Sequence, residues 1–297
     1  MNMSKIHKPV LLDQSIDSLD IQPNGFYIDC TLGDGGHSYE ILKKLSSKGL
    51  LVSIDQDQNA IDFVKSFYKD SLTSSNWILG NSNFSKIDRI AKKYDRKPDG
   101  ILMDLGLSSR QLEESHNRGF SYLEENEPLD MRMDTSLGVK ASDLLKVLSL
   151  RDLTEIFDKY GEEKNAYRIA KLIKKSDKPI ETVGDLTRLV YKVMPTDNSN
   201  KNPSRRVFQA LRIVVNDELN SLKVGLEKSF EVLNENGKLS VITFHSLEDR
   251  IVKQFFNEIV ESGKGSLLFK KPVAPTDIEK EQNPRSASSK LRTLIKY

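Results

Sequence analysis

Residues 27–38 read Tyr27-Ile28-Asp29-Cys30-Thr31-Leu32-Gly33-Asp34-Gly35-Gly36-His37-Ser38. The apolar run at 26–28 predicts a buried strand, and the glycines after it predict a turn that opens a helix over 39–45 with Ser38 as its cap. Glycines let the backbone approach a ligand closely, and the free N–H groups of a helix start favour polar or anionic ligand atoms. The spacing of Gly33, Gly35 and Gly36 departs from the G-x-G-x-x-G of a dinucleotide site, which weakens a pyrophosphate interpretation.

The amino-acid composition is that of a soluble globular protein and limits the kinds of site that the chain can contain. The chain has 297 residues, with 45 Lys and Arg against 43 Asp and Glu, so any affinity for nucleic acid must come from local basic patches. The single cysteine, Cys30, excludes an intramolecular disulfide framework and a multi-cysteine metal site, and we expect it to be a small buried residue and not a nucleophile. There is no apolar signal region and no run of roughly 20 apolar residues. We expect a cytoplasmic protein with no membrane association and no metal.

Apolar strands alternate with helix patterns in the first part of the chain. Strands are predicted at 26–28, 50–54, near 77–79 and at 100–103, which favours an α/β fold with a parallel sheet covered by helices on both faces. Ligands bind such sheets beyond the carboxyl ends of the strands. Asp55 ends the second strand, about 20 residues past the glycine turn, where an acid accepts hydrogen bonds from ribose hydroxyls. Asp104 ends the fourth strand, so several strand ends predict one ligand site.

The sequence pattern changes between residues 111 and 205, where runs typical of helices replace runs typical of strands. Ser149 with Asp152 and Thr182 with Asp185 predict two capped helices, the second ending at Pro195. A third helix, over 167–173, carries many Lys and Arg side chains that we expect to form a solvated face. We therefore predict three segments: the first part of the core at 1–110, an inserted helical domain for substrate recognition at 111–205, and the second part of the core with a basic tail at 206–297.

The last segment returns to the α/β pattern. Residues 207–233 predict one long helix, 238–243 a strand, and Ser246 with Asp249 the cap of a helix over 247–260. The tail beyond residue 284 holds cations and no acid, and it suits either a contact with RNA phosphates or an exposed end strand. Its cations are Arg285, Lys290, Arg292 and Lys296.

Five blocks, in this order, closely resemble the bacterial 16S ribosomal RNA cytosine-N4 methyltransferases over essentially the full length. They are residues 27–38, 104–109, 128–133, 208–212 and 244–250. The resemblance implies a class I methyltransferase with a Rossmann-like core, an inserted helical domain and S-adenosylmethionine as cofactor. It also implies the substrate, a cytosine in the decoding centre (P site) of 16S rRNA, presented as free rRNA or as the small ribosomal subunit.

The resemblance also implies roles for individual residues. By this resemblance, Gly35, Gly36 and His37 contact the cofactor at the glycine turn, and Asp55 is the acid that binds its ribose. Phe84 is the aromatic residue beside the adenine. Asp104 is the acid after the fourth strand, and Gln111 is the glutamine that closes the site. The family usually has proline where this chain has Arg110, so the loop that precedes Gln111 is expected to be less rigid.

The lone pair of a cytosine amine is delocalised into the ring, so the amine is a poor nucleophile. Methyl transfer to it requires the enzyme to align the amine with the sulfonium methyl group and to provide an acceptor for the N–H proton. Asp104 is the candidate acceptor, although it would serve the cofactor instead if the amine is bound elsewhere. His245 is an alternative acceptor whose simpler role is helix capping. Arg205, Arg206 and the basic tail are candidates for holding the RNA backbone.

Other functions stay open on the sequence. An amino methyltransferase acting on another RNA or on DNA would share the same cofactor site, as would a methyltransferase of small molecules. A nicotinamide oxidoreductase and a non-catalytic RNA-binding module are the remaining alternatives, and both a monomer and a homodimer fit the sequence.

Overall fold

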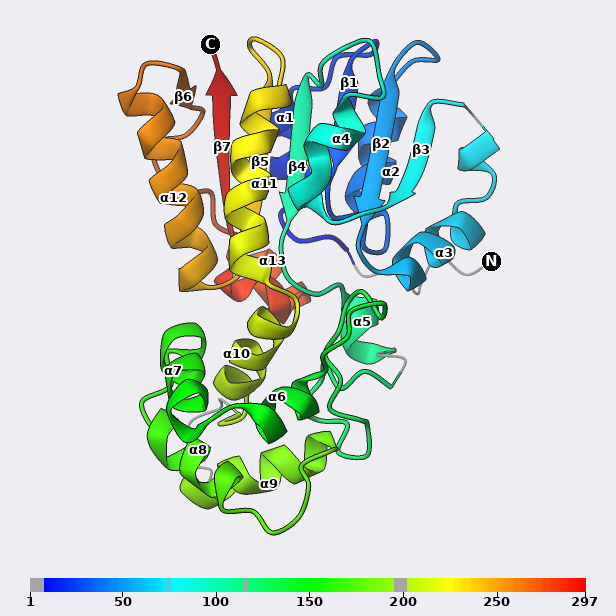
Figure 1. Ribbon diagram of the computed structural model, residues 1–297. Helices are drawn as coiled ribbons and strands as arrows, with labels where there is room; N and C mark the ends of the chain where they lie inside the picture. The colour runs from blue at the N-terminus through cyan, green and yellow to red at the C-terminus, as the bar shows by residue number, and fades with distance from the viewer. Residues whose placement is uncertain (1–7, 74, 115–116, 195–201) are drawn as a thin grey trace. The chain divides into compact units, whose positions relative to one another are not determined.

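The computed structural model describes residues 8–73, 75–114, 117–194 and 202–297. The chain folds into two compact units (Figure 1): Met1–Ser108 with Leu219–Tyr297, which contains the sheet, and Ser109–Glu218, which is helical. The second unit runs past the expected boundary at residue 205 because α10 (Arg205–Val215) packs on α7 (Leu150–Gly161). A Cβ on Gly161 would lie 2.7 Å from the carbonyl oxygen of Arg206, which shows how closely the two helices approach.

A seven-stranded sheet forms the centre of the first unit, in the order β3-β2-β1-β4-β5-β7-β6. β1 to β5 pair in parallel, and β7 is antiparallel to both β5 and β6. The strands are β1 (Phe26–Asp29), β2 (Leu50–Asp55), β3 (Trp77–Asn81), β4 (Gly100–Asp104), β5 (Lys238–Thr243), β6 (Gly265–Leu267) and β7 (Lys290–Lys296). The five predicted strands and the predicted α/β class are confirmed.

Helices cover both faces of this sheet, as the alternation of strands and helices predicts. Along β1, Phe26 and Ile28 pack into one apolar cluster, whereas Tyr27 packs into the other, on the opposite face. The first cluster is completed by α4 (Ile87–Ala91), α11 (Glu218–Val232) and α12 (Ser246–Glu261), and the second by α1 (Leu12–Leu19), α2 (Gly36–Lys44) and α3 (Gln58–Phe67). Among its described residues, this unit also contains α13 (Asp277–Gln282) and the short 3-10 turns η2 (Ser71–Thr73), η3 (Phe84–Lys86) and η4 (Pro284–Ser288).

The strand order reverses between β1 and β4, and this is where such sheets bind ligands. Asp29 ends β1, Asp55 ends β2 and Asp104 ends β4, so three acids stand at the carboxyl ends of neighbouring strands.

Three helix starts differ from the prediction. α2 begins at Gly36 with Gly35 as its N-cap in the left-handed region (φ 82), so Ser38 lies inside the helix and does not cap it. The predicted long helix is two helices, α10 and α11, because Asp217 adopts φ 48 between them. α12 is capped by His245 with Glu248, one residue before the predicted pair.

The basic tail is an interior strand and not an exposed end strand. β7 lies between β5 and β6, and Asp249 of α12 accepts hydrogen bonds from Lys290 Nζ at 2.9 Å and Arg292 Nε at 2.8 Å. Lys296 Nζ donates to the carbonyl oxygen of Phe230 at 2.7 Å and of Leu233 at 2.9 Å, at the end of α11. These three cations hold the fold together, so the structure gives no support to their predicted contact with RNA.

The second unit contains α5 (Ser109–Glu113), α6 (Ala141–Val147), α7, α8 (Ala166–Lys174), α9 (Val183–Val193) and α10. The capping boxes of Ser149 with Asp152 and of Thr182 with Asp185 are confirmed. The predicted helix end at Pro195 and the polar segment 196–201 lie outside the described residues. In the described part of the chain, no helix is both long enough and apolar enough to cross a membrane.

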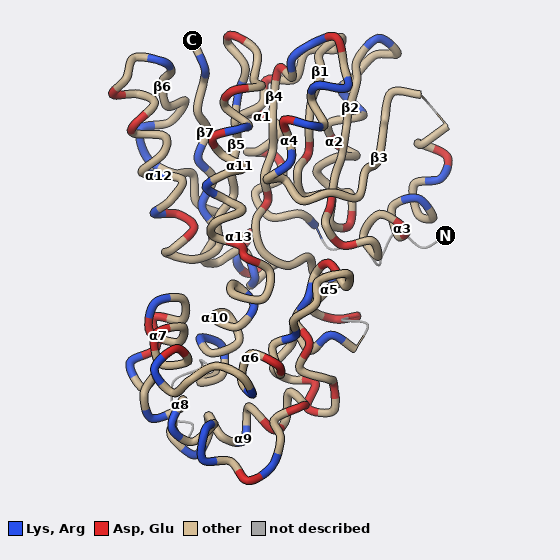
Figure 2. The backbone as a smooth tube through the Cα atoms, viewed as in Figure 1, with Lys and Arg blue, Asp and Glu red and all other residues tan. Residues whose placement is uncertain are grey.

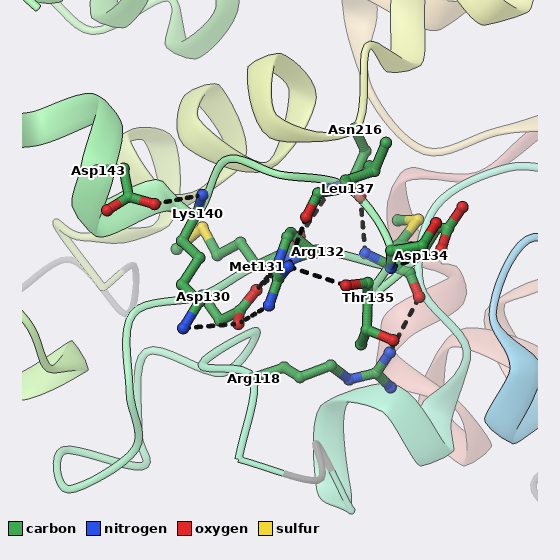
Figure 3. Close-up of polar contacts among 12 residues, drawn as sticks. Arg118, Asp130, Met131, Arg132, Asp134, Thr135, Leu137, Lys140, Asp143 and Asn216 are labelled. Atoms are coloured by element: carbon green, nitrogen blue, oxygen red, sulfur yellow. Dashed lines mark hydrogen bonds and ion pairs between the residues drawn. The ribbon is translucent and has the colours of Figure 1, made fainter. Parts of the chain in front are cut away.

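The segment 128–134 is an irregular loop held by a side chain far along the sequence (Figure 3). Asn216 Nδ2 donates to the carbonyl oxygen of Met131 at 2.8 Å, and Asn216 Oδ1 accepts from the N–H of Met133 at 2.7 Å. Arg132 binds Asp130 through two nitrogens, at 2.7 and 2.8 Å. These bonds stabilise Met131 in the left-handed region (φ 63), which is unusual for a residue with a long side chain.

Candidate active site

Asp29, at the end of β1, organises the centre of the site. It is fully buried; its Oδ2 accepts from Ser38 Oγ at 2.6 Å and its Oδ1 from the N–H of Thr31 at 3.0 Å. Ser38 Oγ also lies 2.7 Å from Ser53 Oγ, so it joins α2 to β1 and β2. Burial raises the pKa of Asp29. Sequence reasoning gave Asp29 no role, although an acid at the end of an otherwise apolar strand was the available signal.

The glycine turn owes its shape to packing within the protein. A Cβ on Gly36 would lie 2.2 Å from Pro9 Cγ, and a Cβ on Gly35 would lie 2.9 Å from Tyr68 Cε2. The sequence predicts close approach by a ligand here; in the structure the atoms that approach these two glycines belong to Pro9 and Tyr68.

Asp55 ties the end of β2 to the same turn. Its Oδ2 accepts from the N–H of Gly33 at 2.9 Å and its Oδ1 from the N–H of Asp57 at 2.8 Å. Burial raises the pKa of Asp55 to about 7, and the nearby Asp57 and Asp29 carboxyls push it in the same direction. Asp55 therefore changes its charge near neutral pH.

His37 and Asp104 face each other, with His37 Nδ1 3.6 Å from Asp104 Oδ2. His37 Nε2 lies 3.2 Å from the carbonyl oxygen of Val10, which only accepts, so this nitrogen carries the hydrogen. Burial lowers the pKa of His37 to about 4 and raises the pKa of Asp104 well above its ordinary value. The contact is thus not an ion pair at neutral pH.

Asp104 is fixed through its backbone while one side-chain oxygen stays without a partner. Its N–H donates to Thr31 Oγ1 at 2.6 Å, which joins β4 to the turn after β1. Its Oδ1 is buried and has no hydrogen-bond partner among the residues that the structure describes. A buried acceptor without a hydrogen bond raises the free energy of the folded protein. A ligand that donates a hydrogen bond to this oxygen would remove that penalty.

Phe84 lies in the loop after β3, half-buried against α11. A Cβ on Gly225 would lie 2.6 Å from Phe84 Cδ2, so the ring fills the space that this glycine leaves. Asn83 Nδ2 donates to Gln56 Oε1 at 2.7 Å, which holds the loop to the residue after Asp55.

Gln111 belongs to the second unit, unlike the other expected cofactor residues. It is buried in α5, the helix that also contains Arg110. Arg110 Nη1 donates to Glu114 Oε2 at 2.6 Å, so the residue that replaces the usual proline takes part in an ion pair one turn apart.

His245 is a capping residue, as its simpler interpretation predicts. Its Nδ1 accepts from the N–H of Glu248 at 3.4 Å, and its Nε2 lies 3.1 Å from Glu248 Oε1. Because both ring nitrogens face Glu248, His245 is a poor candidate for the proton acceptor.

The electrostatics of the site favour a cation. Burial raises the pKa of Asp29, Asp55 and Asp104, and in the described part of the chain no Lys or Arg contributes to lowering any of the three. A ligand with positive charge and hydrogen-bond donors would relieve this cluster of carboxyls.

Comparison with known proteins decides the family. Residues 4–297 match the MraW methylase family. The chain belongs to this family. Membership confirms the enzyme class that the sequence predicts, a methyltransferase dependent on S-adenosylmethionine with a Rossmann-like fold.

Relatives of this methylase match it from end to end. A protein of Clostridium botulinum named ribosomal RNA small subunit methyltransferase H is 46% identical over 309 residues, covering 98% of each chain. One of the same name from Fusobacterium nucleatum is 44% identical and covers 97% of this chain and 96% of its own. A crystal structure from Clostridium thermocellum, described provisionally as an rRNA methylase, covers 98% of this chain and all of its own with a TM-score of 0.50; at 12% identity it supports the fold alone.

Proposed function

We propose that this methylase transfers a methyl group from S-adenosylmethionine to the N4 amine of a cytosine in the decoding centre of 16S rRNA. The name of the relatives, at up to 46% identity over 98% of this chain, supports the small-subunit rRNA as the substrate. The observation in the site that carries the proposal is the buried Oδ1 of Asp104, which has no partner among the described residues; the nearby carboxyl of Asp29, whose pKa burial also raises, acts on the same group.

The residues present fit the cofactor. S-adenosylmethionine carries an ammonium and a sulfonium, and the carboxyls at the ends of β1, β2 and β4 suit this double positive charge. We assign the ribose hydroxyls to Asp55, whose ionised form accepts two hydrogen bonds from them as well as those it already has. We assign the floor of the cofactor site to Gly35, Gly36 and His37, and the position beside the adenine to Phe84.

The cofactor supplies a methyl group on a sulfonium, which attracts a nucleophile. The protein must then align the amine and accept its proton, because the free amine is a poor nucleophile. We assign the acceptor role to Asp104, whose carboxyl must be ionised to take the proton; the positive charge of the bound cofactor would lower the raised pKa of this carboxyl and favour its ionised form. Its backbone is held by Thr31, and its Oδ2 faces the unprotonated Nδ1 of a neutral His37, so neither neighbour supplies a competing proton.

The second unit is the proposed substrate-recognition domain. A base in folded RNA must be unstacked before its amine is reached, and a helical unit inserted between β4 and β5 is suited to hold the surrounding backbone. An rRNA substrate agrees with the cytoplasmic location that the sequence predicts.

The test is mass mapping of 16S rRNA from cells with and without the protein. We expect one cytosine of the decoding centre to lose a methyl group from N4 when the protein is absent. An unchanged 16S rRNA, with loss of methylation from another RNA or from DNA, would instead support the alternative amino methyltransferase.

A further inference from the structure

A row of cations follows one face of α8 and its flanks. Arg168 and Lys171 lie in α8, and Lys164 and Lys175 lie just before and just after it. Their spacing of four, three and four residues suits one side of a helix, and all four side chains are exposed. At about 1.5 Å per residue the row is about 16 Å long. Figure 2 shows basic residues recurring along α8.

In the part of the chain that the structure describes, these four cations have no acidic partner, unlike Lys159 of α7 and Arg188 of α9. In the described part of the second unit, Lys159 of α7 pairs with Glu155, and Arg188 of α9 pairs with Asp185 at 2.8 Å. Within the same described residues, none of the four side chains of the α8 row forms an ion pair. An unneutralised row of like charges is unfavourable for the isolated protein.

Helix stability does not explain the row either. The C-terminal end of a helix favours cations, which accounts for Lys171 in the last turn. Arg168 lies in the first turn of α8, and Lys164 precedes the N-cap Asn165, where the helix dipole disfavours positive charge. A bound anion would offset the cost at these two positions.

An exposed aromatic ring stands beside the row. Tyr167 of α8 is 53% exposed. Lys171 Nζ lies 5.6 Å from the centre of its ring. An exposed ring among cations is the combination that binds a nucleic-acid strand, because bases stack on the ring while phosphates meet the cations.

We propose that Lys164, Tyr167, Arg168, Lys171 and Lys175, here called the α8 face, form a docking surface for the phosphate backbone of RNA. A strand with one phosphate per about 3.4 Å presents about five phosphates along this row. The inference rests on the proposed rRNA substrate and adds the surface that holds it. An acidic protein would satisfy the charges but leaves the exposed ring unexplained, so RNA is the occupant that both observations favour.

The test compares two triple variants of the full chain. In the first, Arg168→Gln, Lys171→Gln and Lys175→Gln remove three charges from the α8 face; in the matched control, Lys223→Gln, Lys253→Gln and Lys264→Gln remove three exposed charges from the first unit. The measurement is the affinity for a 16S rRNA transcript across a series of salt concentrations. It needs no methyl transfer, so its failure is distinct from failure of the proposed function.

The α8 variant is expected to bind the transcript about tenfold or more weakly and to lower the slope of log affinity against log salt by about two, since each phosphate contact contributes roughly 0.7 to 0.9. The control is expected to change neither value. A separate Tyr167→Leu variant is expected to lose roughly tenfold in affinity with an unchanged slope, because stacking is not ionic. Unchanged thermal unfolding and unchanged affinity for S-adenosylhomocysteine show that each variant is folded.

Two results would overturn the proposal. Equal losses in the α8 variant and the control would mean that only net charge matters. An α8 variant that binds naked rRNA normally but assembled small subunits weakly would mean that the surface docks a ribosomal protein and not RNA.

Discussion

His37 Nδ1 lies 3.6 Å from Asp104 Oδ2, yet burial shifts the pKa of both groups toward their uncharged forms. The histidine therefore contributes through its bond to the Val10 carbonyl and not through charge. A histidine that is neutral in the folded protein and one that is ionised there change the stability in opposite directions as the pH falls.

Replacing His37 by Leu should destabilise the ligand-free protein by about 1–3 kcal/mol at neutral pH, since the Val10 carbonyl loses its donor. The folded pKa of about 4 lies below the ordinary value of 6.5, so the unfolded chain binds the proton more readily and the natural protein loses stability as pH falls below about 6.5. The deficit of the variant should accordingly be constant above about pH 6.5 and shrink below it. Denaturant unfolding at several pH values measures this; a deficit that is largest at acid pH would indicate an ion pair.

Cofactor affinity should depend on the ionisation of Asp55. Ribose hydroxyls donate to the ionised carboxylate, so affinity for S-adenosylhomocysteine should fall as pH drops through about 7, the pKa to which burial raises this group. Calorimetry between about pH 5.5 and about pH 8.5 measures this dependence. Asp55→Asn should bind more weakly with a flatter pH profile, whereas an equally steep profile in this variant would assign the dependence to another group.

The raised pKa of Asp55 has the opposite effect on the stability of the ligand-free protein, which falls as the pH rises. Because the folded state holds the proton of Asp55 up to about pH 7, this group lowers stability as pH rises from the ordinary carboxyl range toward 7. Thermal unfolding with and without S-adenosylhomocysteine should therefore show a larger stabilisation by the ligand at pH 8 than at pH 6. A stabilisation that is larger at the lower pH would contradict the assignment.

Gly36→Ala tests the packing of the glycine turn. The added Cβ would lie 2.2 Å from Pro9 Cγ, so the segment around Pro9 must move, and we expect a loss of about 1–3 kcal/mol. Gly138→Ala is the matched control, since nothing lies within 4 Å of its added Cβ and its φ is not positive. Thermal unfolding compares the two, and equal effects would show that the contact with Pro9 is unimportant.

Asn216→Ala should destabilise the second unit by about 2–4 kcal/mol, because the N–H of Met133 and the carbonyl of Met131 both lose their partner (Figure 3). Asn216→Asp keeps the acceptor for Met133 but turns a carboxylate oxygen toward a carbonyl oxygen. Protonation removes that repulsion, so this variant should regain stability at acid pH and lose it as pH rises through the raised carboxyl pKa. A stability deficit independent of pH would show that Asn216 does not face the Met131 carbonyl.

The elements that could be predicted are those whose pattern is local. Four of the five predicted strands are apolar runs followed by an acid or a glycine, the fifth is the apolar run at 238–243, and two capping boxes are complete within four residues. What was missed depends on distant partners: Ser38 resembles a cap but is a buried donor to Asp29, and the loop at 128–134 has no period because Asn216 fixes it. The break at Asp217 is invisible in the apolar pattern, which continues in phase from Val215 to Leu219.

The site was predictable to the same extent. Asp55 and Asp104 could be placed because strand ends are readable, and the resemblance supplied the rest. Phe84 was expected beside the adenine, but its packing against Gly225, some 140 residues away, could only come from the fold. The neutral state of His37 likewise depends on burial, which no motif encodes.

The most direct measurement is methyl transfer by the purified protein. It is incubated with methyl-labelled S-adenosylmethionine and, separately, with 16S rRNA, with small ribosomal subunits and with DNA, and the labelled nucleoside is identified by mass spectrometry. We predict label on N4 of one cytosine in the decoding centre of 16S rRNA, from free rRNA or from subunits, and none in DNA. Label on another atom, in another nucleic acid, or in none of the three would contradict the account.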